Sequence, residues 1–115
     1  LWVEHDGAVW LLQRPAEGIW AGLWSLPLFD DASALDAAAS ALGLRVEALP
    51  PIDHALTHLD WRLHPRRAVA AQRPDIAAQI GAGRWVARDA LATLGLPAPL
   101  AKLLAATSPG PSAPA

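Results

Sequence analysis

One helix signal in the middle of the chain constrains the fold more than any other feature. Asp30 and Asp31 can cap a helix, the alanine-rich run over residues 32–42 favours one, and Gly43 is a residue that commonly ends one. Short segments rich in strand-forming residues lie before and after this run, and further helical signals follow near the end. The order predicts an α+β fold in which a mixed β-sheet is sandwiched by helices.

The residues before this helix predict a hairpin and a loop. Residues 1–13 form two apolar, strand-forming runs around Asp6-Gly7, a dipeptide typical of a tight hairpin turn. Pro15, Gly18 and Gly22 then predict a loop over residues 14–22, followed by a short strand over residues 23–26.

The residues after Gly43 predict a second group of strands. We expect a strand over residues 45–49, a break at Pro50-Pro51, and a hairpin over residues 52–57 and 59–71 that turns near His58 or bulges at His64-Pro65. A strand over residues 84–87 and short helices over residues 89–94 and 97–106 follow. Residues 108–115 hold only Ser, Pro, Gly and Ala, which predicts a disordered tail after one domain over residues 1–107.

Composition excludes several classes of protein. The chain has 115 residues, 53% of them hydrophobic, which suits one soluble domain, and its apolar runs are far shorter than the roughly 20 residues that cross a bilayer. The lack of cysteine excludes a disulfide framework and cysteine-ligated clusters within these residues, and it fits a cytoplasmic protein. A net charge of -2 argues against a domain that binds nucleic acid strongly by itself. The lack of methionine and a first residue inside a strand-like run predict a piece of a longer protein.

The order of hairpin, glycine loop, helix and strand resembles the Nudix family. Its signature is a glycine, five residues, a glutamate, seven residues, then Arg-Glu-apolar-any-Glu-Glu-any-Gly-apolar. With the first glycine on Gly22, the final pair falls on Gly43 and Leu44. The positions of the glutamates are Leu28, Ala37, Ser40 and Ala41. These side chains cannot hold the divalent cations that bridge substrate phosphates, so the resemblance implies the fold without metal-dependent hydrolysis.

Two carboxylates remain near the helix. Asp31 is explained as its N-cap and Asp36 as a solvated surface residue. Neither one replaces the missing set of glutamates.

A closer resemblance is to the C-terminal domain of adenine DNA glycosylases of the MutY type, which is similar to the Nudix enzyme MutT but lacks its hydrolytic residues. Three segments carry the resemblance. They are Arg14-Pro-Ala-Glu-Gly-Ile-Trp-Ala-Gly-Leu-Trp-Ser-Leu-Pro27, His54-Ala-Leu-Thr-His58 and Leu96-Pro-Ala-Pro-Leu-Ala-Lys-Leu-Leu104. The second is similar to the family's His-x-Phe-Ser-His segment.

This resemblance implies a noncatalytic domain that recognises 8-oxoguanine opposite a mispaired adenine during base excision repair. The glycosylase carboxylates and an iron–sulfur cluster would belong to the N-terminal catalytic domain of the parent chain, so no cofactor or metal is expected in these residues. The implied partners are double-stranded DNA containing 8-oxoguanine and that catalytic domain, with no membrane. By position in the family, Leu56, Thr57 and His58 would contact the DNA, with leucine where phenylalanine is common.

The chemistry of the lesion sets what these residues must do. Oxidation turns guanine N7 from an acceptor into a donor, so a reader needs an acceptor at that edge. The Thr57 hydroxyl can accept there but can also donate, and one such bond adds only on the order of 1 kcal/mol, so backbone groups must contribute. Leu56 could wedge a base step. Arg62 and Arg66 would face one way on a strand, where they could contact phosphates or form a solvated face.

Other interpretations stay open. His54 and His58, four residues apart, could join His64 and a nearby Asp in a zinc site, although the spacing is not diagnostic. Trp20 and Trp24 could stack on a base, but packing with Ile19 and Leu23 explains them more simply. As a whole, the chain could instead be a Nudix nucleotide pyrophosphohydrolase with displaced metal ligands, or a Nudix-like scaffold for a protein partner.

Overall fold

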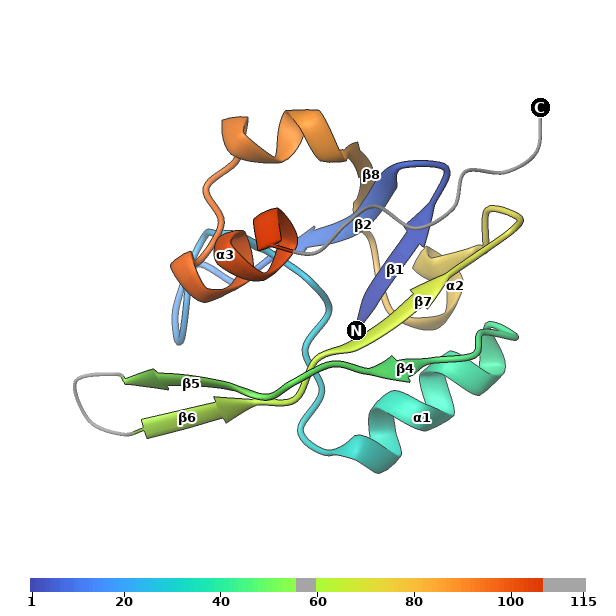
Figure 1. Cartoon of the computed structure of the whole chain (residues 1–115), viewed down its shortest axis with the longest axis horizontal. Helices are drawn as coiled ribbons and strands as arrows, with labels where there is room; N and C mark the ends of the chain where they lie inside the picture. The colour runs from blue at the N-terminus through green and yellow to red at the C-terminus, as the bar shows by residue number, and fades with distance from the viewer. Residues whose placement is uncertain (56–59, 107–115) are drawn as a thin grey trace.

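The computed structural model describes residues 1–55 and 60–106 (Figure 1). Its strands are β1 Trp2–His5, β2 Ala8–Gln13, β3 Trp24–Ser25, β4 Glu47–Ala48, β5 Ile52–Ala55, β6 Asp60–Leu63, β7 Arg66–Val69 and β8 Arg84–Ala87. Its helices are α1 Ala32–Ala41, α2 Ile76–Gln79, the 3₁₀ helix η1 Arg88–Thr93 and α3 Ala98–Ala106. No helix in these two ranges is long and apolar enough to cross a membrane.

Six of the described strands form one mixed sheet. Its order is β3-β2-β1-β7-β4, and β8 also pairs with β2. The hairpin of β1 and β2 turns at Asp6 and Gly7, whose φ angles of 48° and 78° are those of the tight turn that Asp-Gly predicts. β1 also runs parallel to β7, with Trp2 opposite Arg67. This pairing places β1 inside the sheet, between strands from the two halves of the chain.

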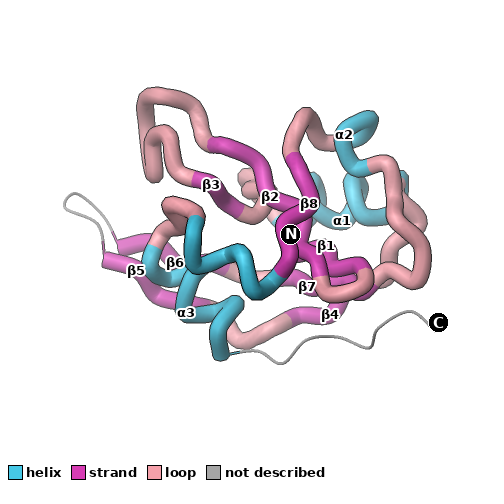
Figure 2. The backbone as a smooth tube through the Cα atoms, turned by 90° about the horizontal axis from the view of Figure 1, so that it is seen from above, coloured by secondary structure: helices cyan, strands magenta, loops and turns pink. Residues whose placement is uncertain are grey.

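Helices cover both faces of the sheet, as the views in Figures 1 and 2 show. Side chains of β1 alternate between two apolar clusters, because successive residues of a strand point to opposite faces. Trp2 packs on the side of η1 and α3, with Leu91, Leu100 and Leu104. Val3 packs on the opposite side, with side chains that include Leu35 of α1 and Ile76 of α2. The expected sheet sandwiched by helices is confirmed.

The ladder of β4 and β7 leads into a second, smaller ladder. β5 and β6 pair antiparallel as a separate two-stranded sheet, with Ile52 opposite Leu63. β4 and β7 pair with Ala48 opposite Arg66. Three residues therefore join β4 to β5 where two join β6 to β7, which is a one-residue bulge on the side of Pro50-Pro51. Figure 1 shows β5 and β6, called the arm below, projecting from one end of the molecule.

Several expectations about single elements were inexact. β3 and β4 are shorter than the predicted strands, and the first of the two C-terminal helices is a 3₁₀ helix. The second predicted hairpin is divided, because its second strand pairs with β5 only as far as Leu63, and β7 then pairs with β1 and β4. The short helix α2 was not predicted. Ile19, expected to share the packing of the tryptophans, is 39% exposed.

Candidate functional site

Helix α1 is held in place by the local signals that predict it. Asp31 has an extended backbone, and its Oδ1 accepts a hydrogen bond of 2.8 Å from the Ala34 amide, so it is the N-cap. At the other end, Gly43 has a φ of 69°, a conformation that favours glycine, and the Leu44 amide donates to the Ala39 carbonyl at 2.9 Å. The helix of the signature therefore begins and ends where the sequence predicts.

The positions of the signature glutamates do not form a metal site. Ala37, Ser40 and Ala41 are exposed on α1, and Leu28 is half-buried in the loop before it. Of the two nearby carboxylates, Asp31 is engaged as the helix cap and Asp36 is exposed. Divalent magnesium needs several oxygen ligands, so these residues do not fit the metal that the fold family implies.

Leu28 instead lines an apolar pocket of about 380 Å³. The pocket lies between the loop before α1, the base of the arm, and α3, and its other lining residues include Phe29, Trp61 and Leu103. The charged residues in its lining include Asp30, Asp31, Arg62 and Arg66. The position of the first signature glutamate thus serves apolar packing.

The backbone nitrogen of Leu1 is also at this pocket. It donates a hydrogen bond of 2.7 Å to the Pro27 carbonyl and is buried. In a polypeptide that starts at Leu1, burial, with a smaller contribution from the charge of Arg66, lowers the pKa of the free amino group to about 5. A charged amine is therefore unfavourable at this position.

The arm has one face toward the body and one toward solvent. His54 lies opposite Trp61 on the face toward the body, and both are half-buried. Asp53 lies opposite Arg62 on the other face. Arg62 Nε donates to Asp53 Oδ1 at 2.8 Å, although the two side chains are 62% and 75% exposed. This hydrogen bond and the charge of Arg62 lower the pKa of the Asp53 carboxyl.

The predicted DNA-contact residues belong to the connection between β5 and β6. Leu56, Thr57 and His58 lie outside the described residues, so their contacts stay a prediction. The paired strands end at Ala55 and begin again at Asp60. The described strands thus lie on either side of the position near which the sequence predicts a turn.

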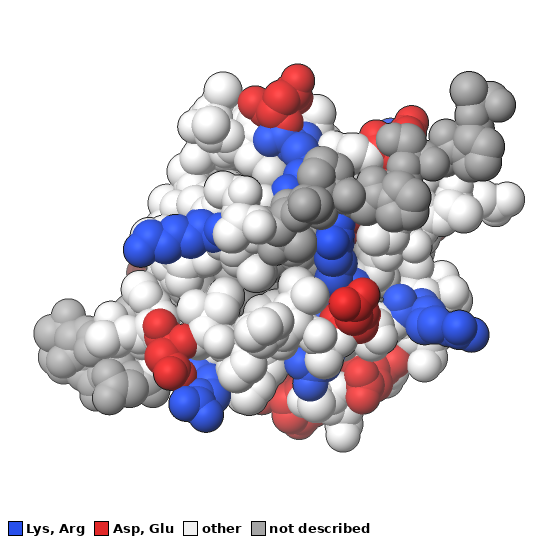
Figure 3. Space-filling model, viewed as in Figure 1, with Lys and Arg blue, Asp and Glu red and all other residues white. Residues whose placement is uncertain are grey.

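The arginines that follow in the sequence do not gather into one patch. Arg66 is half-buried and donates to the neighbouring Pro65 carbonyl at 3.2 Å. The Arg67 side chain pairs with Glu4 and is 13% exposed. The Arg73 guanidinium lies 5.5 Å from the centroid of the Trp85 ring. On the face seen in Figure 3, positive and negative side chains are interspersed. Strong binding to DNA by charge alone is not expected from this arrangement.

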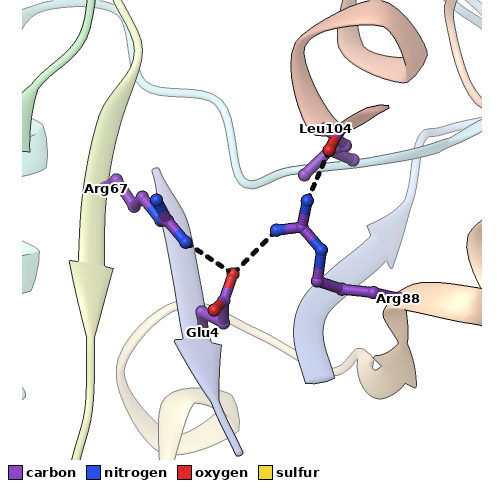
Figure 4. Close-up of polar contacts among 4 residues, drawn as sticks. All are labelled: Glu4, Arg67, Arg88 and Leu104. Atoms are coloured by element: carbon purple, nitrogen blue, oxygen red, sulfur yellow. Dashed lines mark hydrogen bonds and ion pairs between the residues drawn. The ribbon is translucent and has the colours of Figure 1, made fainter. Parts of the chain in front are cut away.

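Sequence reasoning missed a buried polar centre formed around Glu4. Its carboxylate, 1% exposed, accepts hydrogen bonds from Arg67 at 3.1 Å and from Arg88 at 3.0 Å (Figure 4). Arg88 also donates to the Leu104 carbonyl of α3 at 2.5 Å, and both guanidinium groups lie over the Trp2 ring. A lone glutamate in an apolar strand was the available signal, but its partners are more than 60 residues away in sequence.

The zinc interpretation lacks a ligand set among the described residues. His54 packs against Trp20, with 6.0 Å between ring centroids, and His64 is exposed. In residues 1–55 and 60–106, no group of three or more His, Cys, Asp or Glu side chains could hold a metal ion.

Comparisons with known proteins concern this same fold. Residues 1–106 match the family of the NUDIX domain. The structure is similar to the crystal structure of a Nudix hydrolase from M. smegmatis, RenU, with a TM-score of 0.54 and 22% identity, over 91% of this chain and 77% of that chain. No curated protein matches the chain. At this identity the similarity shows the fold alone, so the finer resemblance to adenine DNA glycosylases stays a prediction.

Proposed function

Because the chain belongs to the NUDIX domain family, we propose that it is a noncatalytic lesion-recognition domain of a MutY-type adenine DNA glycosylase. The domain recognises 8-oxoguanine in double-stranded DNA, and the N-terminal catalytic domain of the parent chain flips and excises the adenine. The iron–sulfur cluster belongs to that catalytic domain. The parent is then a cytoplasmic hydrolase of N-glycosyl bonds, and this domain supplies recognition.

One observation carries this proposal. The spacing from Gly22 to Gly43 and the helix α1 agree with the Nudix signature, but no carboxylate stands at the positions of the signature's glutamates. Ala37, Ser40 and Ala41 occupy the face where a hydrolase would need oxygen ligands. Without them, cations that bridge phosphates and activate water have no set of ligands on this helix. A Nudix-like domain without these metal ligands can still bind a nucleobase, because such binding needs a complementary shape and hydrogen bonds rather than a metal.

The arm supports the second part of the proposal. It projects from the body and carries Leu56, Thr57 and His58 between its strands. In the proposed complex, Leu56 probes the base step beside the lesion, the Thr57 hydroxyl accepts from the N7–H of 8-oxoguanine, and His58 contacts the backbone. A short projecting hairpin can reach into a groove while the rest of the domain stays outside.

Arg62 and Arg66 are the proposed phosphate contacts, and their surroundings differ. Arg62 is largely exposed, so it can exchange Asp53 for a phosphate at little cost. Arg66 is half-buried beside the pocket and would need a phosphate at the base of the arm. We therefore expect Arg62 to contribute more to the salt dependence of DNA binding.

The first test uses the chain alone. Fluorescence anisotropy with labelled duplexes should show weak, salt-sensitive binding with little preference for 8-oxoguanine, because the net charge is -2. Tight, selective binding by the isolated chain would contradict this expectation. In the parent gene, the region upstream of Leu1 should encode a helix-hairpin-helix and four spaced cysteines.

The decisive test uses the domain joined to its catalytic domain. Thr57→Val should lower the ratio of adenine excision opposite 8-oxoguanine to excision opposite guanine by roughly fivefold, the size expected for one lost hydrogen bond. Thr93→Val, the same change at an exposed position of η1, is the matched control. If Leu56→Ala and Thr57→Val both leave the ratio unchanged, lesion recognition by these residues is wrong and a protein-interaction scaffold is favoured.

A second candidate function is nucleotide hydrolysis with displaced metal ligands. The similarity to the M. smegmatis Nudix hydrolase favours it. Its test is magnesium-dependent release of pyrophosphate from 8-oxo-dGTP by the purified chain. Turnover that Asp36→Asn abolishes would favour the hydrolase, since Asp36 is the exposed carboxylate of α1.

A further inference from the structure

Trp20 has a backbone conformation that its side chain does not favour. Its φ of 56° lies in the left-handed region, where residues with a Cβ are strained. Gly18 and Gly22 in the same loop also have positive φ angles, but glycine adopts them freely. A tryptophan persists in such a conformation only when surrounding contacts hold it there.

Backbone hydrogen bonds close the loop around Trp20. The Leu23 amide donates to the Trp20 carbonyl at 3.0 Å, and the Gly22 amide donates to the Pro15 carbonyl at 2.9 Å. The loop is closed at its base by the Arg14 amide, which donates to the Leu23 carbonyl at 2.8 Å. These bonds set the backbone near Trp20 and orient its side chain.

The indole of Trp20 contacts both strands of the arm. Its centroid lies 5.0 Å from that of Trp61, with the rings inclined by 44°, and 6.0 Å from that of His54, inclined by 51°. His54 and Trp61 are directly opposite each other across the β5–β6 ladder. One side chain of the loop thus touches a cross-strand pair, and we call Trp20, His54 and Trp61 the aromatic brace.

The arm needs such a support because the main sheet does not extend into it. β5 and β6 form a separate two-stranded sheet beyond the bulge at Pro50-Pro51. A two-stranded hairpin alone is only marginally stable in water. Its outer face carries the Asp53–Arg62 pair, which is largely exposed and adds little rigidity.

We propose that Trp20 is a positioning residue, which fixes the direction of the arm and thereby the placement of its connecting residues on damaged DNA. The positioning of DNA contacts rests on the proposed function, whereas the bracing of the arm does not. Trp20 itself need not touch DNA. Its left-handed backbone and its ring act together, because the strained conformation aims the indole at the arm.

Two variants distinguish the contribution of the Trp20 ring from that of its backbone conformation. Trp20→Gly removes the ring and also relieves the positive φ, so the fold of the loop is retained. Trp20→Phe keeps an aromatic ring in the brace. Ile19→Ala is the matched control, since Ile19 is the adjacent loop residue and 39% exposed.

The first measurement is amide hydrogen exchange by NMR on the 115-residue chain. Trp20→Gly should lower protection of the β5–β6 amides by about tenfold and leave the β1–β2 amides unchanged, because the arm opens locally. The NMR signals of the His54 ring protons should lose the ring-current chemical shift caused by the Trp20 indole. Trp20→Phe should restore most of the protection, and Ile19→Ala should change neither strand pair. Unchanged arm protection in Trp20→Gly, or equal loss in both strand pairs, would overturn the brace.

The second measurement is the excision ratio for 8-oxoguanine over guanine in the joined glycosylase. Trp20→Gly should lower the ratio and Trp20→Phe should restore it. If the wild-type protein shows no preference, the proposed function is wrong, while hydrogen exchange still decides on the brace. If the wild-type ratio is high and Trp20→Gly loosens the arm without lowering it, the positioning role is wrong although recognition stands.

Discussion

Two carboxylates, Glu4 and Asp53, meet arginines at similar distances in very different surroundings. In the core, Glu4 meets Arg67 at 3.1 Å and Arg88 at 3.0 Å with 1% of its side chain exposed. On the arm, Asp53 meets Arg62 at 2.8 Å with 75% exposed. The shorter contact is the weaker one in water, because solvent screens it and both side chains must be ordered to make it. Burial, rather than distance, decides which contact supports the fold.

The two carboxylates also differ in what they connect. The Glu4 centre joins β1, β7, η1 and, through the Leu104 carbonyl, α3. The Asp53–Arg62 contact joins two strands that are already paired to each other. Loss of the first should therefore affect the whole domain, whereas loss of the second should leave it folded and release Arg62 for another partner.

The largest effect is expected from Glu4→Gln. The change leaves two largely buried arginine side chains, 13% and 15% exposed, without their carboxylate, which costs about 3–5 kcal/mol in the free energy of unfolding. Urea unfolding followed by tryptophan fluorescence measures it. Glu17→Gln, the same change at an exposed position, should cost less than about 0.5 kcal/mol. Equal stability of the two variants would show that the core centre is not a structural ion pair.

The next effect concerns a buried amino group that meets a carbonyl instead of a carboxylate. In a protein whose first residue is Leu1, the pKa of the amino group falls from 8.0 unfolded to about 5 folded. The unfolded state then binds more protons between pH 5 and 8, so stability should rise with pH across this window, by at most about 4 kcal/mol.

Urea midpoints across this pH range measure that effect. A variant with one added glycine before Leu1 is the control, because a peptide nitrogen can still donate to the Pro27 carbonyl but cannot ionise. If the same pH dependence persists in the extended protein, the amino group of Leu1 does not cause it.

A smaller effect is expected from Arg88→Lys, which keeps the charge of the core centre. Lysine lacks the planar fork that bonds Glu4 and the Leu104 carbonyl at once, so about 1–3 kcal/mol should be lost. Arg45→Lys, at an exposed position that follows α1, is the control for the same chemical change. A stability equal to that of the wild type would mean that charge alone, without geometry, maintains the centre.

The smallest effect on stability is expected from Asp53→Asn. Because Arg62 lowers the pKa of Asp53 below 3.8, any stabilisation by this carboxylate is present at neutral pH and is lost as the pH falls through that lowered value. The urea midpoint at pH 7 should barely change. The same variant should bind DNA more tightly at low salt, because one negative charge beside Arg62 is gone. A large fall in the midpoint would contradict the contrast between arm and core.

Short-range signals along the chain account for much of what could be predicted. Asp6-Gly7 specifies the first hairpin, and Asp31 and Gly43 delimit α1, because turns and caps depend on neighbours within a few residues. The missing glutamates are also visible in sequence. The short strands β3 and β4 and the helix α2 were misjudged because each is only two to four residues long.

Long-range pairing accounts for the rest, and no local pattern encodes it. The parallel alignment of β1 with β7 brings Arg67 to Glu4, and the bulge at Pro50-Pro51 separates the arm from the main sheet. The approach of Trp20 to the arm likewise depends on how a loop and a hairpin pack. These contacts join residues tens of positions apart in the sequence. The register of the paired strands is therefore fixed only when the core packs, because packing excludes the competing alignments.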